Sequence, residues 1–159
     1  MLLGFQRQFA PYVEEASKTH TVRGVRKIHP RAGETCHCYV DPRQKTMRLL
    51  GRFPCVRVQD ITLWPRVSVG PPDFSELTGV LLRVAIDGVE LSEPEVEAFF
   101  FRDGFRGPFE DPPRRHDYPI IKDRRQALSV LYPATAAAMR FWKARAFPFA
   151  GHLIHWEYR

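Results

Sequence analysis

The stretch that decides the fold runs from position 48 to position 63 and reads Arg-Leu-Leu-Gly-Arg-Phe-Pro-Cys-Val-Arg-Val-Gln-Asp-Ile-Thr-Leu. Apolar and polar residues alternate through 48–53 and again through 56–63. A period of two is typical of strands with one buried face. Pro54 lacks the N–H that a strand interior uses, so we expect two strands with a break between them.

Similar patterns on both sides of this stretch predict the remaining elements. We expect further strands at 2–5, 36–40, 80–86 and 151–158, and a strand or extended loop at 19–23. Helices are expected at 9–16, at 134–146 and at 96–101, the last preceded by a capping box of Ser92 and Glu95. Proline-rich loops are expected at 64–73 and 107–119. Short strands with a few helices indicate an α+β domain built on a small, mostly antiparallel barrel or sheet.

Length and composition restrict the class of protein. A chain of 159 residues with 44% hydrophobic and 26% charged residues is typical of one globular domain. No apolar run is long enough for a membrane span, and the apolar opening is too short for a signal peptide. Three cysteines, an odd number, without a secretory signal argue against a disulfide framework. We therefore expect a cytoplasmic protein without membrane contact, monomeric by default.

The basic residues gather in one part of the chain. Between residues 18 and 57, ten lysines and arginines stand against two acidic residues, so this stretch carries +8 and the rest of the chain −2. Such a local surplus is typical of proteins that bind phosphate groups, whose oxygens suit the planar fork of arginine. A solvated basic face that aids solubility is the alternative.

The cysteines do not form a metal-ligand pattern. Cys36 and Cys38 would lie on one face of a strand with His37 on the other, and only Cys55 remains as a further thiol. A structural zinc site needs a second ligand pair. We therefore interpret these thiols as small core residues and expect no metal and no cofactor.

One run, Lys18-Thr19-His20-Thr21-Val22-Arg23, places an amine and a hydroxyl where a predicted helix gives way to a strand. A threonine hydroxyl is a nucleophile only when a neighbouring base takes its proton, and lysine does so only when its pKa is lowered. Surrounding cations lower it by disfavouring the ammonium form. An exposed strand edge is compatible with the same sequence, so the run alone does not decide between a catalytic pair and a surface strand.

This run is one of several segments that together resemble the ASCH domain family, especially its small phage-borne and prophage-borne members. The resemblance is carried by 3–6, 18–23, Lys27, His29, Arg31, 33–34, Arg43, Lys45, Cys55, 103–105 and 151–156. It implies a PUA-like fold, a small mixed β-barrel with helices packed around it. The chain would be a single domain over 1–159, with an insertion at about 107–135.

Some members of this family hydrolyse the acetyl amide of acetylated cytidine. The resemblance implies that Thr21 is the nucleophile, Lys18 its general base, and Asp103 the carboxylate that orients Lys18 or protonates the departing amine. Asp103 is one methylene shorter than the family's glutamate, and an Asp-Gly turn at the end of a helix explains it equally well.

The resemblance also implies a nucleoside, nucleotide or RNA ligand in a basic cleft. The residues expected to bind it are Arg23, Arg26, Lys27, His29, Arg31, Arg43 and Lys45. The function favoured by the sequence is an amidohydrolase acting on N-acylated cytidine nucleosides or related nucleotides. The alternatives are a non-catalytic RNA- or nucleotide-binding module and a ribonuclease.

Overall fold

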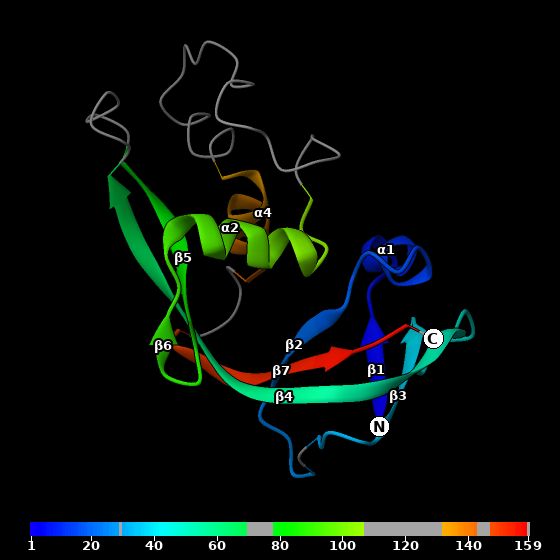
Figure 1. The fold of residues 1–159 in the computed structure, drawn as a ribbon. Coiled ribbons are helices and arrows are strands. Elements are labelled where there is room, and N and C mark those ends of the chain that lie inside the picture. The colour runs from blue at the N-terminus through cyan, green and yellow to red at the C-terminus, as the bar shows by residue number, and fades with distance from the viewer. Residues whose placement is uncertain (29, 70–77, 107–131, 143–146, 159) are drawn as a thin grey trace. The chain divides into compact units, whose positions relative to one another are not determined.

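The computed structural model describes residues 1–28, 30–69, 78–106, 132–142 and 147–158 (Figure 1). Within these residues, seven strands form one mixed sheet, accompanied by three α-helices. The expected mixed α+β class is confirmed. In chain order the elements are β1 (Leu2–Phe5), the 3-10 helix η1 (Arg7–Phe9), α1 (Ala10–Glu14), β2 (His20–Gly24), β3 (Thr35–Val40), β4 (Arg48–Val69), β5 (Thr78–Ile86), β6 (Val89–Glu90), α2 (Glu93–Arg102), α4 (Pro133–Trp142) and β7 (Phe149–Trp156).

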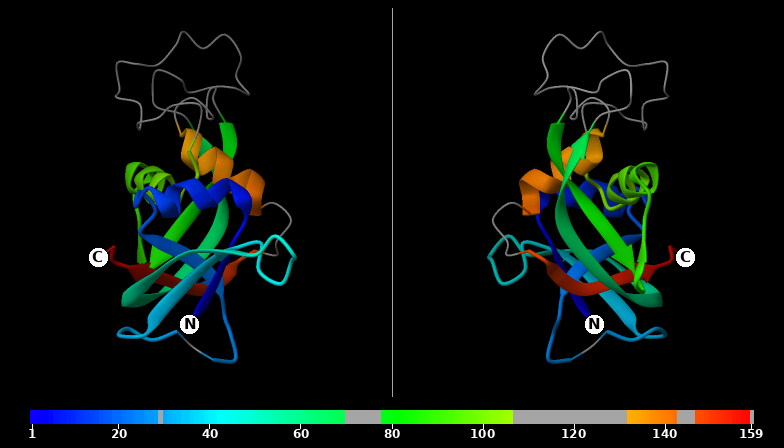
Figure 2. Two further views of the ribbon diagram at one scale, coloured as in Figure 1. Left: turned by 90° about the vertical axis from the view of Figure 1, so that its right-hand side faces the viewer. Right: turned by 90° about the vertical axis from the view of Figure 1, so that its left-hand side faces the viewer.

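The sheet has the strand order β1-β3-β4-β5-β6, and β7 pairs with both β4 and β2. β1 runs parallel to β3, whereas the β3–β4, β2–β7 and β5–β6 pairs are antiparallel. The N-terminus lies at one end of the β1–β3 ladder, and the chain enters α1 at the other end (Figure 2). These pairings do not show the sheet closed into the expected barrel.

The chain divides into two compact units. Unit 1 comprises Met1–Ile61, Arg102–Gly104 and Ala150–Arg159, and unit 2 comprises Thr62–Phe101 and Phe105–Phe149. The single domain and the insertion at about 107–135 stay predictions, and residues 107–131 lie outside the described part. None of the described helices is long and apolar enough to cross a membrane.

β4 differs most from expectation, because it continues through Pro54 and on to Val69. Pro54 stands opposite Thr35, the first residue of β3, so its missing N–H falls at the end of that ladder. The Pro54 carbonyl accepts a hydrogen bond from the Glu157 N–H at 3.2 Å. The expected break at Pro54 is therefore wrong, and residues 64–69 are strand where a loop was expected.

The core of unit 1 follows the predicted alternation. Cys36 and Cys38 are fully buried on one face of β3, while His37 between them is half-buried. Trp156 of β7 packs with its ring 6.0 Å from Phe5 at a steep angle. Burial of such aromatic and aliphatic side chains supplies most of the favourable free energy of folding.

Unit 2 contains α2 and α4, and each helix begins with identifiable contacts. The Ser92 N–H and hydroxyl donate to the Glu95 carboxylate at 2.8 and 2.6 Å just before α2 begins at Glu93, which confirms Glu95 as the predicted partner of Ser92. The buried carboxylate of Glu97 accepts hydrogen bonds from the Ala134 N–H and from the Thr135 N–H and hydroxyl at 2.7–2.8 Å. Glu97 thereby satisfies the first turn of α4.

Candidate active site

The turn after α1 places Lys18 inside unit 1. Ala16 adopts a left-handed conformation with φ 58° at the end of the helix. The Lys18 N–H then donates to the Tyr12 carbonyl at 2.9 Å, and the Tyr158 hydroxyl donates to the Lys18 carbonyl at 2.6 Å. Hydrogen bonds thus hold both the backbone N–H and the backbone carbonyl of Lys18, and only 2% of the Lys18 surface is exposed.

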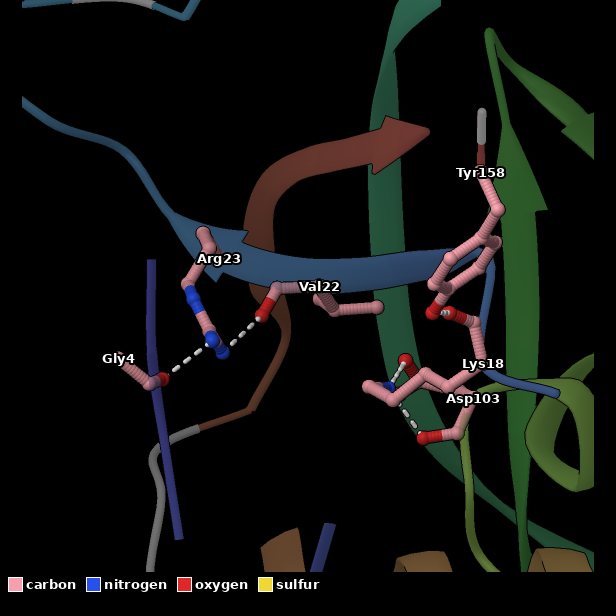
Figure 3. Close-up of polar contacts among 6 residues, drawn as sticks. All are labelled: Gly4, Lys18, Val22, Arg23, Asp103 and Tyr158. Atoms are coloured by element: carbon pink, nitrogen blue, oxygen red, sulfur yellow. Dashed lines mark hydrogen bonds and ion pairs between the residues drawn. The ribbon is translucent and has the colours of Figure 1, made fainter. Parts of the chain in front are cut away.

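The Lys18 amine forms a buried ion pair with Asp103 (Figure 3). It donates to the Asp103 carboxylate and also to the Asp103 backbone carbonyl. Asp103 follows the last residue of α2, and Gly104 after it has φ +88°. A Cβ at Gly104 would also lie 3.0 Å from Tyr12 and 3.1 Å from Phe9. The Asp-Gly turn and the contact with Lys18 therefore occur together, and glycine permits both.

The surroundings of this pair favour its uncharged forms. Burial lowers the pKa of Lys18, the Asp103 carboxylate opposes this, and the positive charge of Arg23 adds to the lowering. Burial likewise raises the pKa of Asp103, against the opposite effect of Lys18. The Lys18 Nζ lies 5.8 Å from the centre of the Phe5 ring and 5.2 Å from that of Phe9. An amine in such an apolar site gives up its proton nearer to neutral pH than an exposed lysine does.

Thr21 lies on β2 and is 3% exposed. It stands opposite Ile154 of β7, and alternation puts it on the same face of β2 as Arg23. The Arg23 guanidinium lies 5.0 Å from the centre of the Phe5 ring, the ring that Lys18 also contacts. Thr21 therefore shares its face of β2 with Arg23, whose guanidinium contacts the Phe5 ring. No hydrogen bond joins its hydroxyl to the Lys18 amine within the described residues.

The other residues expected to bind the ligand lie apart from one another. Arg26, Lys27 and Arg31 are exposed in the loop after β2, where the Arg26 guanidinium donates to the Leu2 carbonyl at 3.2 Å. This places the loop at the first residue of β1.

Arg43 and Lys45 are exposed in the loop after β3. The first residue of this loop, Asp41, donates its N–H to the carbonyl of Phe5, the last residue of β1. The two groups of cations thus occupy opposite ends of the β1–β3 ladder and are not brought together. His29 lies outside the described residues.

A groove in unit 1 was missed by sequence reasoning. It has a volume of about 340 Å³ and lies between α1 and the segment 40–48. Two ion pairs line it, Arg7–Asp41 at 2.7 Å and Arg48–Glu14. Each cation on its walls already has a carboxylate partner, so the groove offers no surplus charge to an anion. The two partners of each ion pair are 34 residues apart in the sequence, so no local pattern predicts that they meet.

Residues capable of holding a metal ion do not cluster. Within the described part of the chain, no group of three or more His, Cys, Asp and Glu side chains is placed to hold one. The absence of a metal or cofactor stays a prediction.

Comparison with known proteins adds no assignment. No protein-family model, no curated protein and no solved structure matches this chain.

Proposed function

We propose that this chain is an amidohydrolase that acts on N-acylated cytidine nucleosides or related nucleotides, as its resemblance to the ASCH family implies. The observation that carries the proposal is the buried ion pair of Lys18 and Asp103, 85 residues apart in the sequence. The same two residues and Thr21, three positions after Lys18, are those that the resemblance marks as catalytic. Strongly perturbed, buried titratable pairs are concentrated in active sites.

The chemistry requires an uncharged amine, a hydroxyl and a group that orients the amine. The Lys18 amine takes the Thr21 proton while the Thr21 Oγ attacks the carbonyl carbon of the acyl amide. The Lys18 ammonium then protonates the exocyclic nitrogen of cytosine, the C–N bond breaks, and the acyl group stays on Thr21 as an ester. Water activated by Lys18 hydrolyses this ester to the carboxylic acid. Asp103 orients the amine throughout by accepting its hydrogen bond.

A PUA-like barrel is proposed for unit 1 on the basis of its outer strands. Five strands follow one another by pairing in the order β2-β7-β4-β3-β1. The two outer members are joined by side chains, because the Arg23 guanidinium of β2 donates to the Gly4 carbonyl of β1 at 2.5 Å. Arg26, just after β2, donates to the Leu2 carbonyl of β1. These contacts support a sheet that curls until its two outer strands meet.

The test of the function is hydrolysis of N4-acetylcytidine, followed by ultraviolet absorbance. We expect turnover by the wild type and a loss of at least about a thousandfold in Thr21→Val, which keeps the shape but removes the hydroxyl. Thr21→Ser should retain part of the rate. Thr19→Val is the matched control, since Thr19 is exposed on the same segment. An inactive wild type would refute the function, and full activity in Thr21→Val would refute the nucleophile.

The loop after β2 favours a second candidate, an RNA- or nucleotide-binding module. Val25 and Ile28 are 67% and 83% exposed there, beside the exposed cations Arg26 and Lys27. Cations bind phosphates, and exposed aliphatic side chains can pack on bases.

Binding of a fluorescent single-stranded RNA, measured by anisotropy at several salt concentrations, tests this candidate. Replacing Arg26 and Lys27 by alanine should reduce the slope of log affinity against log salt by about one to two. Arg43→Ala is the control from the other loop. Unchanged slopes would refute binding at this loop, and shortened RNA in the same samples would indicate a ribonuclease.

A further inference from the structure

The guanidinium of Arg23 is held in one place by several contacts (Figure 3). It donates to the Gly4 carbonyl at 2.5 Å and to the Val22 carbonyl at 3.1 Å. Its central carbon lies 5.0 Å from the centre of the Phe5 ring. Two carbonyls and a ring face thus fix a positive charge that does not titrate in the range where proteins are stable.

This fixed charge acts on the same site as the Lys18 amine. The Lys18 Nζ lies 5.8 Å from the centre of the same Phe5 ring. The Lys18 amine is buried and Arg23 is half-buried, so repulsion between positive charges at these two positions is screened less than between exposed groups. Burial is the main cause that lowers the pKa of Lys18, and the positive charge of Arg23 adds to it; the same charge opposes the rise that burial causes in the pKa of Asp103.

The other groups around the Lys18 amine supply no second positive charge that acts on its protonation within the described residues. The Asp103 carboxylate favours the ammonium form of Lys18, and Phe9 presents an apolar ring. Burial raises the pKa of the Cys38 thiol to about 12, so Cys38 is uncharged near neutral pH. Tyr158 donates to the backbone carbonyl of Lys18 and not to its amine. Within the described residues, the charge that opposes Asp103 at the amine is that of Arg23.

We propose that Arg23 is a positioning residue of this site, whose anchored charge acts together with burial to hold the Lys18 amine in the uncharged form that accepts the Thr21 proton. The inference rests on the proposed function, because only a reaction that needs a base at Lys18 makes use of it. Arg23 does not touch the reacting atoms in this role. The one side chain joins β1 to β2 and adjusts the protonation of Lys18.

Two substitutions at Arg23 separate its contact between β1 and β2 from its effect on the protonation of Lys18. Arg23→Lys keeps the positive charge but loses the planar fork that reaches both carbonyls. Arg23→Gln keeps an amide N–H donor but removes the charge. Arg26→Gln is the matched control, since Arg26 also donates to a β1 carbonyl and loses one charge, yet it is not among the groups that act on the Lys18 amine.

The first measurement is independent of activity. The chain has five lysines, so side-chain NMR of protein labelled with ¹³C-lysine gives few signals, and lysine-to-arginine variants at the other four assign Lys18 by elimination. We expect the Lys18 titration to move to higher pH in Arg23→Gln and to stay near the wild-type position in Arg23→Lys and Arg26→Gln. Circular dichroism checks that each variant is folded. An unchanged titration in folded Arg23→Gln, or an equal shift in Arg26→Gln, overturns the proposal.

The second measurement is the pH profile of kcat/KM for N4-acetylcytidine. Its acid limb should move to higher pH in Arg23→Gln, because the uncharged amine then forms only at higher pH, and should stay in place in Arg23→Lys. An acid limb that does not move with the Lys18 titration refutes the role of Arg23 in the reaction. A wild type without turnover refutes the proposed function itself, and the NMR titration still decides whether Arg23 acts on Lys18.

Discussion

Removing one partner of the Lys18–Asp103 pair should destabilise the protein strongly. The two side chains are 2% and 5% exposed, so solvent does not replace the hydrogen bonds that a substitution removes. Lys18→Met keeps the apolar stem and removes the amine, which leaves the Asp103 carboxyl group and its backbone carbonyl without their donor. Breaking a buried pair in this way costs about 3–5 kcal/mol. The total stability of a typical domain is about 5–15 kcal/mol, so this is a large fraction of it.

The assay is urea unfolding of the wild type, Lys18→Met, Asp103→Asn and the double variant, followed by circular dichroism. The double variant should cost less than the sum of the single variants, by about 1–3 kcal/mol, because both single variants remove the same buried interaction. Arg48→Met is the control, since the Arg48–Glu14 pair is 57% and 39% exposed and should contribute almost nothing. Equal unfolding midpoints for Lys18→Met and Arg48→Met, or fully additive costs, would refute this reasoning.

Three further predictions concern other buried or half-buried groups. Burial and the charge of Arg57 lower the pKa of His155, so the unfolded chain takes up its proton first as the pH falls. Urea midpoints should therefore drop between pH 7 and pH 5, and less so in His155→Gln; equal drops would contradict the assignment. Burial raises the pKa of Cys36 and Cys38 to about 12, and all three cysteines are buried. Ellman's reagent should thus detect almost no thiol until urea is added, and rapid labelling of the native protein would disagree. Glu97→Ala should cost about 1–3 kcal/mol in urea unfolding, because the first N–H groups of α4 lose their acceptor, whereas Glu97→Gln should cost less. Equal costs would show that the carboxylate charge matters more than its hydrogen bonds.

Local patterns in the sequence predict the elements whose structure depends on near neighbours. The alternation through β3 indicates correctly which of its residues are buried, because side-chain direction in a strand depends on position alone. The capping box at Ser92 and Glu95 is predicted correctly because its partners are three residues apart. Neither feature needs information from the rest of the chain.

Features that depend on distant partners are not visible in the same way. The continuation of β4 through Pro54 follows from the end of its pairing with β3, which the run 48–63 does not reveal. β6 has only two residues and lies opposite Ala85 and Ile86, too short for a period to be detected. Tyr158 reaches Lys18 across 140 residues, and no spacing rule relates them. The contact between Lys18 and Asp103 likewise joins residues 85 positions apart, which periodicity does not relate.

The contact between β1 and β2 has a consequence for local motion. Within the described residues these strands share no backbone ladder, and arginine side chains connect them instead. Separating two such side chains from their carbonyls breaks far fewer hydrogen bonds than unzipping paired strands. Local opening of the protein should therefore start at this seam, and amide hydrogen exchange should be faster for the β1 N–H groups that are not bonded to β3 than along the β3–β4 ladder. The buried Thr21, which lies on the same face of β2 as Arg23, would then meet solvent without the rest of unit 1 unfolding.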